Sequence, residues 1–254
     1  MVCQKESKLL QDKKTAFFIA GPNGSGKTTF SVSLIKNTKI LTGMHLNADI
    51  ILKANEKDKL FEGLNPLEKH LKVSSLIENK IDELIEAGEN LILETVFSSE
   101  HKLKTFKKLK EAGYFIHMVF VATQDPLINV QNVALRYLKG GHEVAISKIF
   151  KRYDGALNNL KTIAQEVDCL ILIDNSVINQ APIIHTALSN GAKCFINEEC
   201  EVPEWIQEII DITNDRLDDE TKVNVCNQIQ SVLDDKFIDL VNLDTDEMLK
   251  KLED

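Results

Sequence analysis

The sequence contains no pair of cysteines at the C-x-x-C spacing that is typical of zinc sites and redox motifs. Its five cysteines are odd in number, and one of them, Cys169, lies within an apolar run. Disulfide frameworks are typical of small secreted domains. We therefore interpret the cysteines as reduced thiols and expect neither a disulfide framework nor a zinc site.

Long apolar segments are also missing from the sequence. No apolar run approaches the roughly 20 residues that a membrane-spanning helix needs. Residues 1–14 are polar and lack the apolar core of a secretion signal. Internal repeats and low-complexity linkers do not occur either. We therefore expect a soluble, cytoplasmic protein with no membrane partner.

Positive charge is scarce at the C-terminal end of the chain. Residues 198–254 hold 18 acidic and 5 basic residues, a net charge of −13, whereas the whole chain carries −9. Residues 1–197 therefore carry +4, because −9 minus −13 is +4. A mildly basic core suits a polyphosphate ligand, and an acidic end disfavours a nucleic-acid-binding surface. We therefore expect no nucleic-acid partner.

The motif that is present in full is a phosphate-binding loop. Residues 16–20 are apolar and predict a buried strand, and residues 21–28 match G-x-x-x-x-G-K-[ST]. The glycines let backbone N–H groups face an anion, and the next helix adds the positive end of its dipole. Lys27 should reach the β- and γ-phosphates, and the Thr28 hydroxyl should hold Mg²⁺. The predicted nucleotide-binding residues are Gly21, Pro22, Asn23, Gly24, Ser25, Gly26, Lys27, Thr28 and Thr29.

Two acidic residues lie at the ends of short predicted strands. Asp49 follows a strand around residues 44–46, and Glu94 ends a strand at 90–94. The carboxyl ends of parallel strands form the binding edge of an α/β sheet. Asp49 is either the general base for an attacking hydroxyl or the N-cap of the segment after it. Glu94 is either a magnesium-site residue acting through water or a salt-bridging or capping acid.

Alternating strands and helices favour an α/β fold with a doubly wound, mainly parallel five-stranded sheet. Further strands are predicted at 114–122 and 167–173, and a turn at 189–191 predicts a hairpin of residues 181–188 and 192–196. After residue 203, short amphipathic helices with acidic outer faces follow. We expect a core of residues 1–197 and an acidic helical extension of residues 198–254. The helices of the core are predicted at 65–87, 101–111, 127–139 and 146–166.

The last two of these helices carry Arg136 and Arg152 and are joined by a Gly-Gly turn. Residues 127–164 are therefore predicted to form a lid that brings both arginines to the phosphates when it closes. The alternative is that the arginines are exposed helix cations. His142, beside the turn, is either a ligand contact or a turn-stabilising residue.

Taken in order, these motifs resemble the zeta-toxin-like P-loop kinases over about residues 15–176. The resemblance rests on residues 21–29, 47–49, 94–95 followed by Ser98, 110–114, Arg136 with 140–142, 151–153 followed by 159–160, and 174–176. It implies a P-loop kinase that transfers the γ-phosphoryl group of ATP or GTP, with Mg²⁺, to a hydroxyl of a small molecule such as UDP-N-acetylglucosamine. The site residues it implies are Lys27, Asp49, Arg136 and Arg152 for catalysis, Thr28 and Glu94 for the metal, and Asn47, Glu94, Thr95 and His142 for the substrate.

Many members of that family are toxins held by an antitoxin, so the resemblance also implies an antitoxin-like partner. The sequence departs from it at Leu52 and Asn132, where relatives carry arginines. Such changes affect acceptor choice most, because a pocket built for one polar group rejects ligands that lack it. A nucleotide-binding switch without kinase activity, with residues 198–254 docking a partner, is the alternative function. A third hypothesis is that the acidic segment restrains the basic core near the lid.

Overall fold

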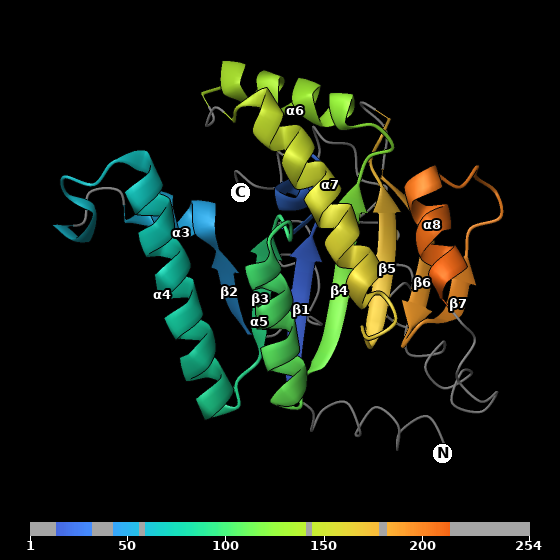
Figure 1. Cartoon of the computed structure of the whole chain (residues 1–254), viewed down its shortest axis with the longest axis horizontal. Coiled ribbons are helices and arrows are strands. Elements are labelled where there is room, and N and C mark those ends of the chain that lie inside the picture. Colours follow the sequence, from blue (N-terminus) through green and yellow to red (C-terminus); the bar gives the residue numbers. More distant parts are fainter. Residues whose placement is uncertain (1–13, 32–42, 56–58, 141–143, 178–181, 214–254) are drawn as a thin grey trace, which may run out of the picture.

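The computed structural model describes residues 14–31, 43–55, 59–140, 144–177 and 182–213. Within them lies a seven-stranded sheet in the order β2-β3-β1-β4-β5-β6-β7 (Figure 1). The strands are β1 (Thr15–Ala20), β2 (Met44–Asn47), β3 (Leu91–Thr95), β4 (Phe115–Ala122), β5 (Cys169–Asp174), β6 (Ile183–Ser189) and β7 (Ala192–Ile196). The helices are α3 (Ala48–Ala54), the 3-10 helix η1 (Lys59–Phe61), α4 (Pro66–Ala87), α5 (Glu100–Glu111), α6 (Pro126–Leu138), α7 (Ile146–Ile163) and α8 (Glu204–Ile212). A further helix begins at Lys27.

The first five strands pair in parallel, which confirms the predicted parallel sheet. The predicted hairpin also forms, but it pairs with the edge of the sheet through β5 and so adds two antiparallel strands. Its two-residue loop holds Asn190 at φ 47° and Gly191 at φ 80°. Two positive φ values in succession are what a tight hairpin turn requires, and Asn-Gly is the favoured pair for it.

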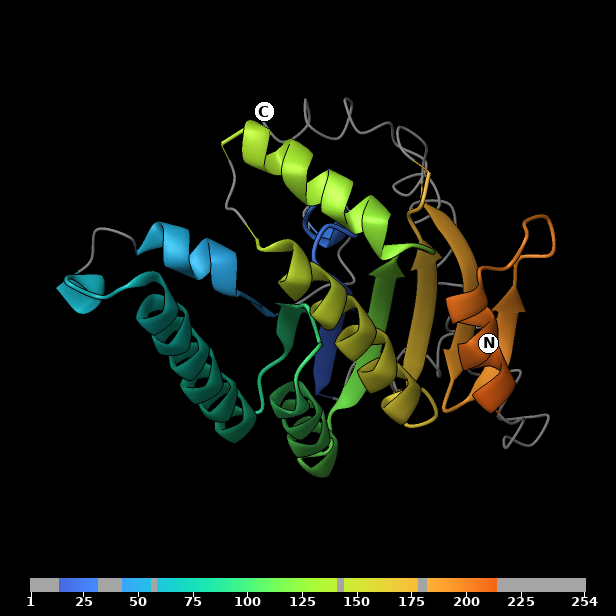
Figure 2. The same ribbon diagram turned by 45° about the horizontal axis from the view of Figure 1, so that its top comes forward.

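Most of the helices lie on one face of the sheet. Helices α4, α5, α7 and α8 cover that face (Figures 1 and 2) and enclose one hydrophobic core with the strands. Right-handed crossovers explain the placement of α4, α5 and α7, because the connections β2–β3, β3–β4 and β4–β5 all advance in one direction across the sheet. The connection from β1 to β2 runs the other way, so the helix that begins at Lys27 lies on the opposite face. Phe30 of that helix packs there against Phe17 and Ile19.

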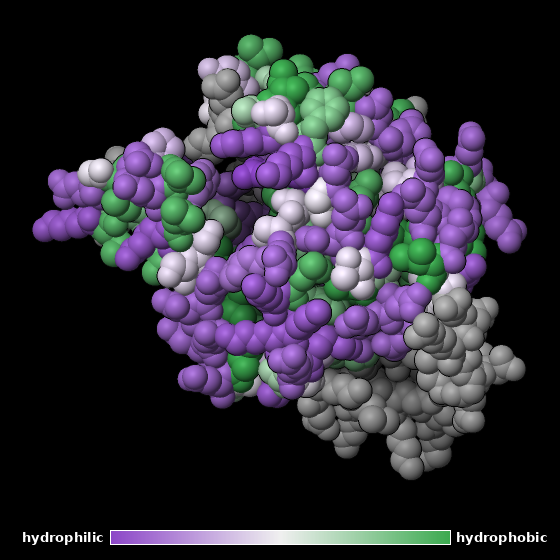
Figure 3. Space-filling view, in the orientation of Figure 1, coloured by the Kyte–Doolittle hydropathy of each residue, from purple (hydrophilic) through white to green (hydrophobic). Residues whose placement is uncertain are grey.

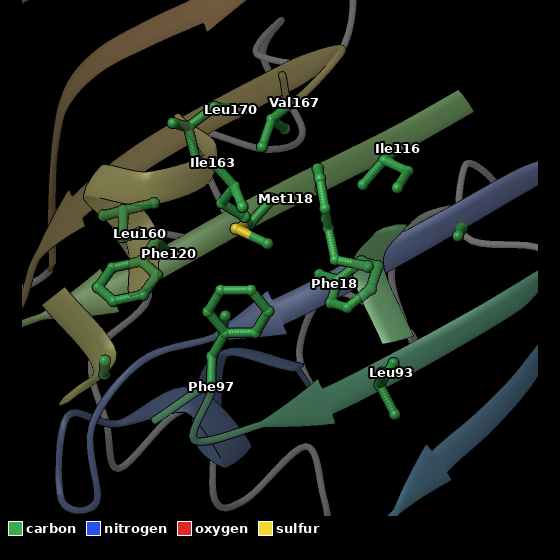
Figure 4. Close-up of a cluster of buried hydrophobic side chains, with 14 of the residues drawn as sticks. Phe18, Leu93, Phe97, Ile116, Met118, Phe120, Leu160, Ile163, Val167 and Leu170 are labelled. Atoms are coloured by element: carbon green, nitrogen blue, oxygen red, sulfur yellow. The ribbon is translucent and has the colours of Figure 1, made fainter. Parts of the chain in front are cut away.

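The main core is built around aromatic side chains at the centre of the sheet. The Phe18 and Phe97 rings meet edge to face, with centroids 6.1 Å apart, and Met118, Phe120 and Leu160 surround them (Figure 4). All five side chains are buried. This packing holds the carboxyl ends of β1, β3 and β4 together at one edge of the sheet.

Helix α4 begins and ends where its sequence predicts. The Asn65 side chain accepts hydrogen bonds from the backbone N–H groups of its first turn, the Glu68 side chain accepts one from the Asn65 backbone N–H, and Gly88 ends the helix at φ 69°. The predicted apolar stripe is only partly buried, since Leu67 and Leu71 are 67% and 63% exposed. A helix of 22 residues is longer than the five-residue strand β3, so its first turns extend beyond the sheet (Figure 1).

Helix α8 is the part of the predicted C-terminal extension that the structure describes. Its Trp205, Ile206 and Ile209 are buried in the main core, and the Trp205 ring lies 6.0 Å from that of Phe120. The predicted helices after it lie outside the described residues. None of the helices in the described ranges is both long and apolar enough to cross a membrane.

Candidate active site

The phosphate loop follows β1 and is packed tightly between two parts of the chain. Gly24 has φ 80° and lies so close to α6 that a Cβ there would be 2.5 Å from the Asn129 carbonyl oxygen. Gly26 has φ 89°, and a Cβ there would be 2.4 Å from the Asn175 amide nitrogen. Both positions therefore favour glycine for conformation, and Gly24 also needs it for space, because its neighbour is a backbone oxygen.

Side chains hydrogen-bond to four successive carbonyl oxygens of this loop. The donors are Lys27 Nζ to Pro22 at 2.6 Å, Asn129 Nδ2 to Asn23 at 2.6 Å, Asn132 Nδ2 to Gly24 at 2.9 Å, and Asn175 Nδ2 to Ser25 at 3.0 Å. The Ser25 N–H also lies 3.4 Å from the Pro22 oxygen, at the outer limit of a hydrogen bond. Sequence reasoning missed Asn129 as a site residue and noted Asn132 and Asn175 only as positions in a family pattern.

Lys27 is buried, and burial lowers its pKa to about 8. The negative charges of Glu94 and Asp49 oppose that shift, and the positive charges of Arg136 and Arg152 add to it. All four charged groups therefore lie near enough to act on the Lys27 ammonium. The predicted catalytic residues Asp49, Arg136 and Arg152 thus contribute to the electrostatic environment of Lys27, and their role in catalysis stays a prediction.

Glu94 ends β3 and accepts hydrogen bonds from two hydroxyls. Thr28 Oγ1 donates to Oε1 at 2.6 Å and Ser31 Oγ donates to Oε2 at 2.7 Å, while His45 Nε2 lies 3.6 Å from Oε2. Burial raises the pKa of Glu94, but the interactions with His45, Thr28, Ser31 and Asn47 outweigh burial and lower it to about 2. The carboxylate is therefore ionised at neutral pH. The sequence analysis did not identify Ser31 as a site residue. Its position one helical turn after Thr28 is a signal that could have done so, because it places both hydroxyls on one helix face.

Asp49 lies in the first turn of α3 and is exposed. The N-cap of this helix is Asn47, whose Oδ1 accepts from the backbone N–H of Asp49 at 2.8 Å and of Ile50 at 3.2 Å. The interpretation of Asp49 as an N-cap is therefore wrong. An asparagine two positions before an acid makes the better cap here, because Asn47 is still extended at φ −131° while Asp49 is already helical.

The other predicted substrate residues lie beside the same edge. Asn47 and Glu94 are register partners at the ends of β2 and β3. Thr95 is buried, and its hydroxyl accepts a hydrogen bond from the Phe97 N–H at 3.1 Å, which stabilises the turn after β3. Thr29 is half-buried in the helix that begins at Lys27.

The two predicted lid arginines differ in their surroundings. Arg152 on α7 is half-buried, and its Nη1 donates to the Asn23 side-chain oxygen at 3.1 Å. Arg136 on α6 is exposed. His142 lies outside the described residues. A hollow opens between the α3–α4 part of the surface and helices α6 and α7 (Figure 3), which leaves room for ligands at this edge.

The oxygen atoms near the loop suit a magnesium ion. Mg²⁺ prefers hard oxygen ligands and usually combines one or two carboxylates with waters and substrate phosphates. The Thr28 hydroxyl and the ionised Glu94 carboxylate, 2.6 Å apart, are ligands of this kind. Among the described residues, no group of three or more histidine, cysteine, aspartate or glutamate side chains gathers as a metal site.

A parallel sheet with a phosphate loop after β1, an acid at the end of the neighbouring β3 and two arginine-bearing helices after β4 is the architecture of a P-loop kinase. Comparison with known families agrees with this class. The family model for zeta toxin matches residues 2–181, and the chain belongs to the zeta toxin family.

Known proteins similar to this chain are distant in sequence. A structure from the PezAT chromosomal toxin-antitoxin system of Streptococcus pneumoniae aligns with a TM-score of 0.50 and 14% identity, covering 91% of this chain and 93% of the other. The complex of AvrRxo1-ORF1 and ORF2 with ATP aligns with a TM-score of 0.54 and 12% identity, covering 97% and 82%. An uncharacterized protein of Haemophilus influenzae is 24% identical over 157 residues, 59% of this chain and 99% of that protein.

Proposed function

We propose that the protein is a Mg²⁺- and nucleoside triphosphate-dependent kinase that transfers the γ-phosphoryl group to a hydroxyl of a small molecule. The observation that carries this proposal is the phosphate loop with its buried Lys27, flanked by two polar contacts. Thr28 donates a hydrogen bond to Glu94, and Arg152 donates one to Asn23 of the loop. Phosphoryl transfer needs positioning and charge stabilisation more than covalent chemistry, and these groups supply both.

Each residue has a distinct role in the proposed reaction. Lys27, Arg136 and Arg152 balance the negative charge of the phosphoryl group that moves. Asp49 is exposed and ionisable, so it accepts the proton of the attacking hydroxyl. Thr28 and Glu94 would hold Mg²⁺, and the ion would supply positive charge that offsets the charge of the phosphates.

The family resemblance suggests a nucleotide sugar, and UDP-N-acetylglucosamine is the first compound to test. Leu52 is partly buried against the main core on α3, and Lys53 beside it is exposed. A neutral side chain at position 52 favours an acceptor that differs from that of relatives with an arginine there.

The test is transfer of phosphate in a small-molecule mixture that contains ATP or GTP and Mg²⁺, followed by mass spectrometry. We expect an acceptor that gains one phosphate with wild type but not with Lys27→Ala. Asp49→Asn should lower the transfer rate by about 10²- to 10⁴-fold, the range for a general base, and change nucleotide affinity by less than about twofold. The matched control is Asp211→Asn, an exposed aspartate on α8.

Nucleotide binding with slow hydrolysis and no phosphorylated acceptor would contradict the kinase proposal and favour the nucleotide-dependent switch. An equal loss of nucleotide binding and transfer in Asp49→Asn would contradict the role of Asp49 as a base.

We also propose an antitoxin-like protein partner. The similar structures come from a toxin-antitoxin system and from a two-protein complex, which motivates this proposal. Growth arrest on expression of wild type, but not of Lys27→Ala, is the expected sign that such a partner is needed.

A further inference from the structure

We propose that Asn129, Asn132 and Asn175 hold the phosphate loop in its anion-binding shape before any nucleotide arrives. We call these three side chains the asparagine clamp. The inference rests on the proposed function only in naming the anion as the phosphates of a nucleoside triphosphate. In this proposal, α6 supports the phosphate loop through Asn129 and Asn132, and it also carries Arg136.

The clamp acts on the orientation of the loop peptides. A trans peptide group is planar, so its C=O and N–H point in opposite directions. Asn129 holds the Asn23 carbonyl and Asn175 holds the Ser25 carbonyl. The N–H groups of the same two peptides, those of Gly24 and Gly26, are therefore turned away from α6 and from Asn175. The N–H between them, that of Ser25, faces the Pro22 oxygen, so the Gly24 and Gly26 N–H groups are the two that this arrangement offers to an anion.

The amide of Asn129 is itself fixed. Its side chain is fully buried, and its Oδ1 accepts a hydrogen bond from the Thr123 hydroxyl at the end of β4. This bond directs Nδ2 toward the loop. Tyr153 on α7 in turn donates its hydroxyl to the Thr123 carbonyl at 2.5 Å. Asn129 is thus tied through Thr123 to the sheet and to α7 by hydrogen bonds within the chain.

Carboxamides suit this task because they donate hydrogen bonds without carrying charge. A carboxylate in the same place would repel both the carbonyl oxygens and an incoming phosphate, and an ammonium group would compete for the phosphate. Position 132 is where relatives in the sequence pattern carry arginine, so this chain has a neutral donor there. Arg136 follows Asn132 by four residues and therefore shares its helix face. The bond from Asn132 to the loop thereby holds the helix face that also carries Arg136 against the loop.

The first test needs no ligand. Hydrogen–deuterium exchange is measured on the peptide that covers residues 21–29 in wild type, Asn132→Leu and Asn175→Leu. Leucine matches asparagine in size but cannot donate, and both positions are half-buried, so the fold tolerates the change. Loss of one neutral hydrogen bond corresponds to about a fivefold change in an equilibrium, so we expect the loop to exchange about fivefold faster in each variant. Gln131→Leu, at the exposed neighbouring carboxamide of α6, is the matched control and should exchange like wild type.

The second test separates affinity from turnover. If only a fraction of the molecules holds the loop in its binding shape, the apparent Kd equals the intrinsic Kd divided by that fraction. We expect the Kd for ATP or GTP to rise about fivefold in Asn175→Leu, with kcat at saturating nucleotide within about twofold of wild type, because bound phosphates restore the loop. In Asn132→Leu, we expect the Kd to rise similarly and kcat to fall as well, since Arg136 loses its anchor.

Unchanged loop exchange and unchanged nucleotide affinity in both variants would overturn the proposal. Faster exchange spread equally over β4 and β5 would also overturn it, because that result means a general loss of stability. If Asn132→Leu fails to fold, loop exchange and nucleotide affinity are measured instead on Asn175→Leu and on the isosteric Asn132→Asp. Unchanged values in both of these variants would then overturn the proposal. If wild type binds neither ATP nor GTP, the proposed function fails, whereas exchange in the ligand-free loop still decides whether the clamp exists.

Discussion

At the scale of single residues, burial disfavours the charged form of both Lys27 and Glu94, but hydrogen bonds outweigh burial only at Glu94. Lys27 is held in a buried place that disfavours its charge, so its pKa falls to about 8. Glu94, also buried, receives two hydroxyl hydrogen bonds that favour its charge, so its pKa falls to about 2. The lysine therefore costs stability in the ligand-free protein and the glutamate adds to it.

We predict that Lys27→Met stabilises the ligand-free protein at pH 7. The ammonium of wild type is charged in both states below pH 8, so the full penalty of its lowered pKa, about 3 kcal/mol, applies there. Loss of its hydrogen bond to Pro22 leaves a gain of about 2 kcal/mol. The gain should shrink as pH rises from 8 toward 10.5, because the folded lysine is then neutral. Urea unfolding at pH 7 and pH 10 measures this, with the exposed Lys139→Met as control. An equal gain at both pH values would show that burial of the Lys27 charge is not the cause.

The same lowered pKa predicts the pH dependence of activity. The ratio kcat/KM for the nucleotide reports ionisations of the free enzyme. Lys27 must be charged to attract phosphates, so kcat/KM should fall as pH rises through about 8. A pH profile from 6 to 10 tests this. A profile that stays level to pH 10 would show that Lys27 remains charged there.

We predict that Glu94→Gln reduces the loss of folding stability that wild type shows as pH falls from 4.5 to 2. The glutamate has a folded pKa of about 2 against 4.5, so its stabilisation is present above pH 4.5 and is lost as pH falls toward 2. The variant should be about 3 kcal/mol less stable at pH 7 and nearly equal to wild type at pH 2. Denaturant titrations across this range measure the difference, and a constant offset at every pH would contradict it.

At the scale of elements, helix α7 supports the segment that follows β3. A Cβ at Gly155 would lie 2.7 Å from the Ser98 carbonyl oxygen. One turn later, Asn159 Nδ2 donates to the Phe97 oxygen at 2.9 Å and the Ser99 oxygen at 3.1 Å. This helix face therefore holds the turn next to Thr95 and Glu94 in place.

Gly155→Ala tests this contact. Alanine in place of glycine inside a helix usually stabilises by up to about 1 kcal/mol. Here the added methyl meets a backbone oxygen that cannot move alone, so we expect a net loss of about 1–3 kcal/mol. Thermal unfolding measures the change, with the exposed Lys151→Ala on the same helix as the control. An increase in Tm would show that α7 and the turn can separate without cost.

At the scale of the whole molecule, α8 joins the acidic C-terminal segment to the core. The predicted boundary at residue 197 separates α8 from the sheet, yet Trp205, Ile206 and Ile209 are buried in the main core. Any test of regulation by the acidic segment therefore needs a chain that keeps α8. Lys161 on α7 also pairs with Glu208 of α8 at 2.6 Å.

We predict that a chain ending at Thr213 unfolds cooperatively, whereas a chain ending at Asn197 is strongly destabilised or aggregates. The shorter chain exposes the apolar surface that Trp205 and its neighbours cover. Trp205→Ala in the full chain should cost about 3–5 kcal/mol, the usual range for a buried aromatic residue. Calorimetry on the three proteins measures this. Normal stability of the chain ending at Asn197 would contradict the role of α8.

Much of the fold could be predicted because its signals are local. The phosphate loop, the Asn65 cap of α4 and the Asn190-Gly191 hairpin each depend on backbone preferences within a few residues. The stripe on α4 was less predictable, because burial of Leu67 and Leu71 depends on how far the helix extends past the sheet. Glu94 and Lys27 were recognisable as candidate site residues, because one ends a strand and the other lies in the phosphate loop.

The sequence by itself determined that this chain has a nucleotide-type phosphate loop on a parallel α/β sheet, because that motif is written in consecutive residues. Only the tertiary structure decided that Asn47 rather than Asp49 caps α3, and that three asparagines hold the loop. Asn129, Asn132 and Asn175 are separated from their loop partners by 106, 108 and 150 positions. An asparagine on a helix or after a strand has no local pattern that reveals such a contact, since the chain must fold before donor and acceptor meet.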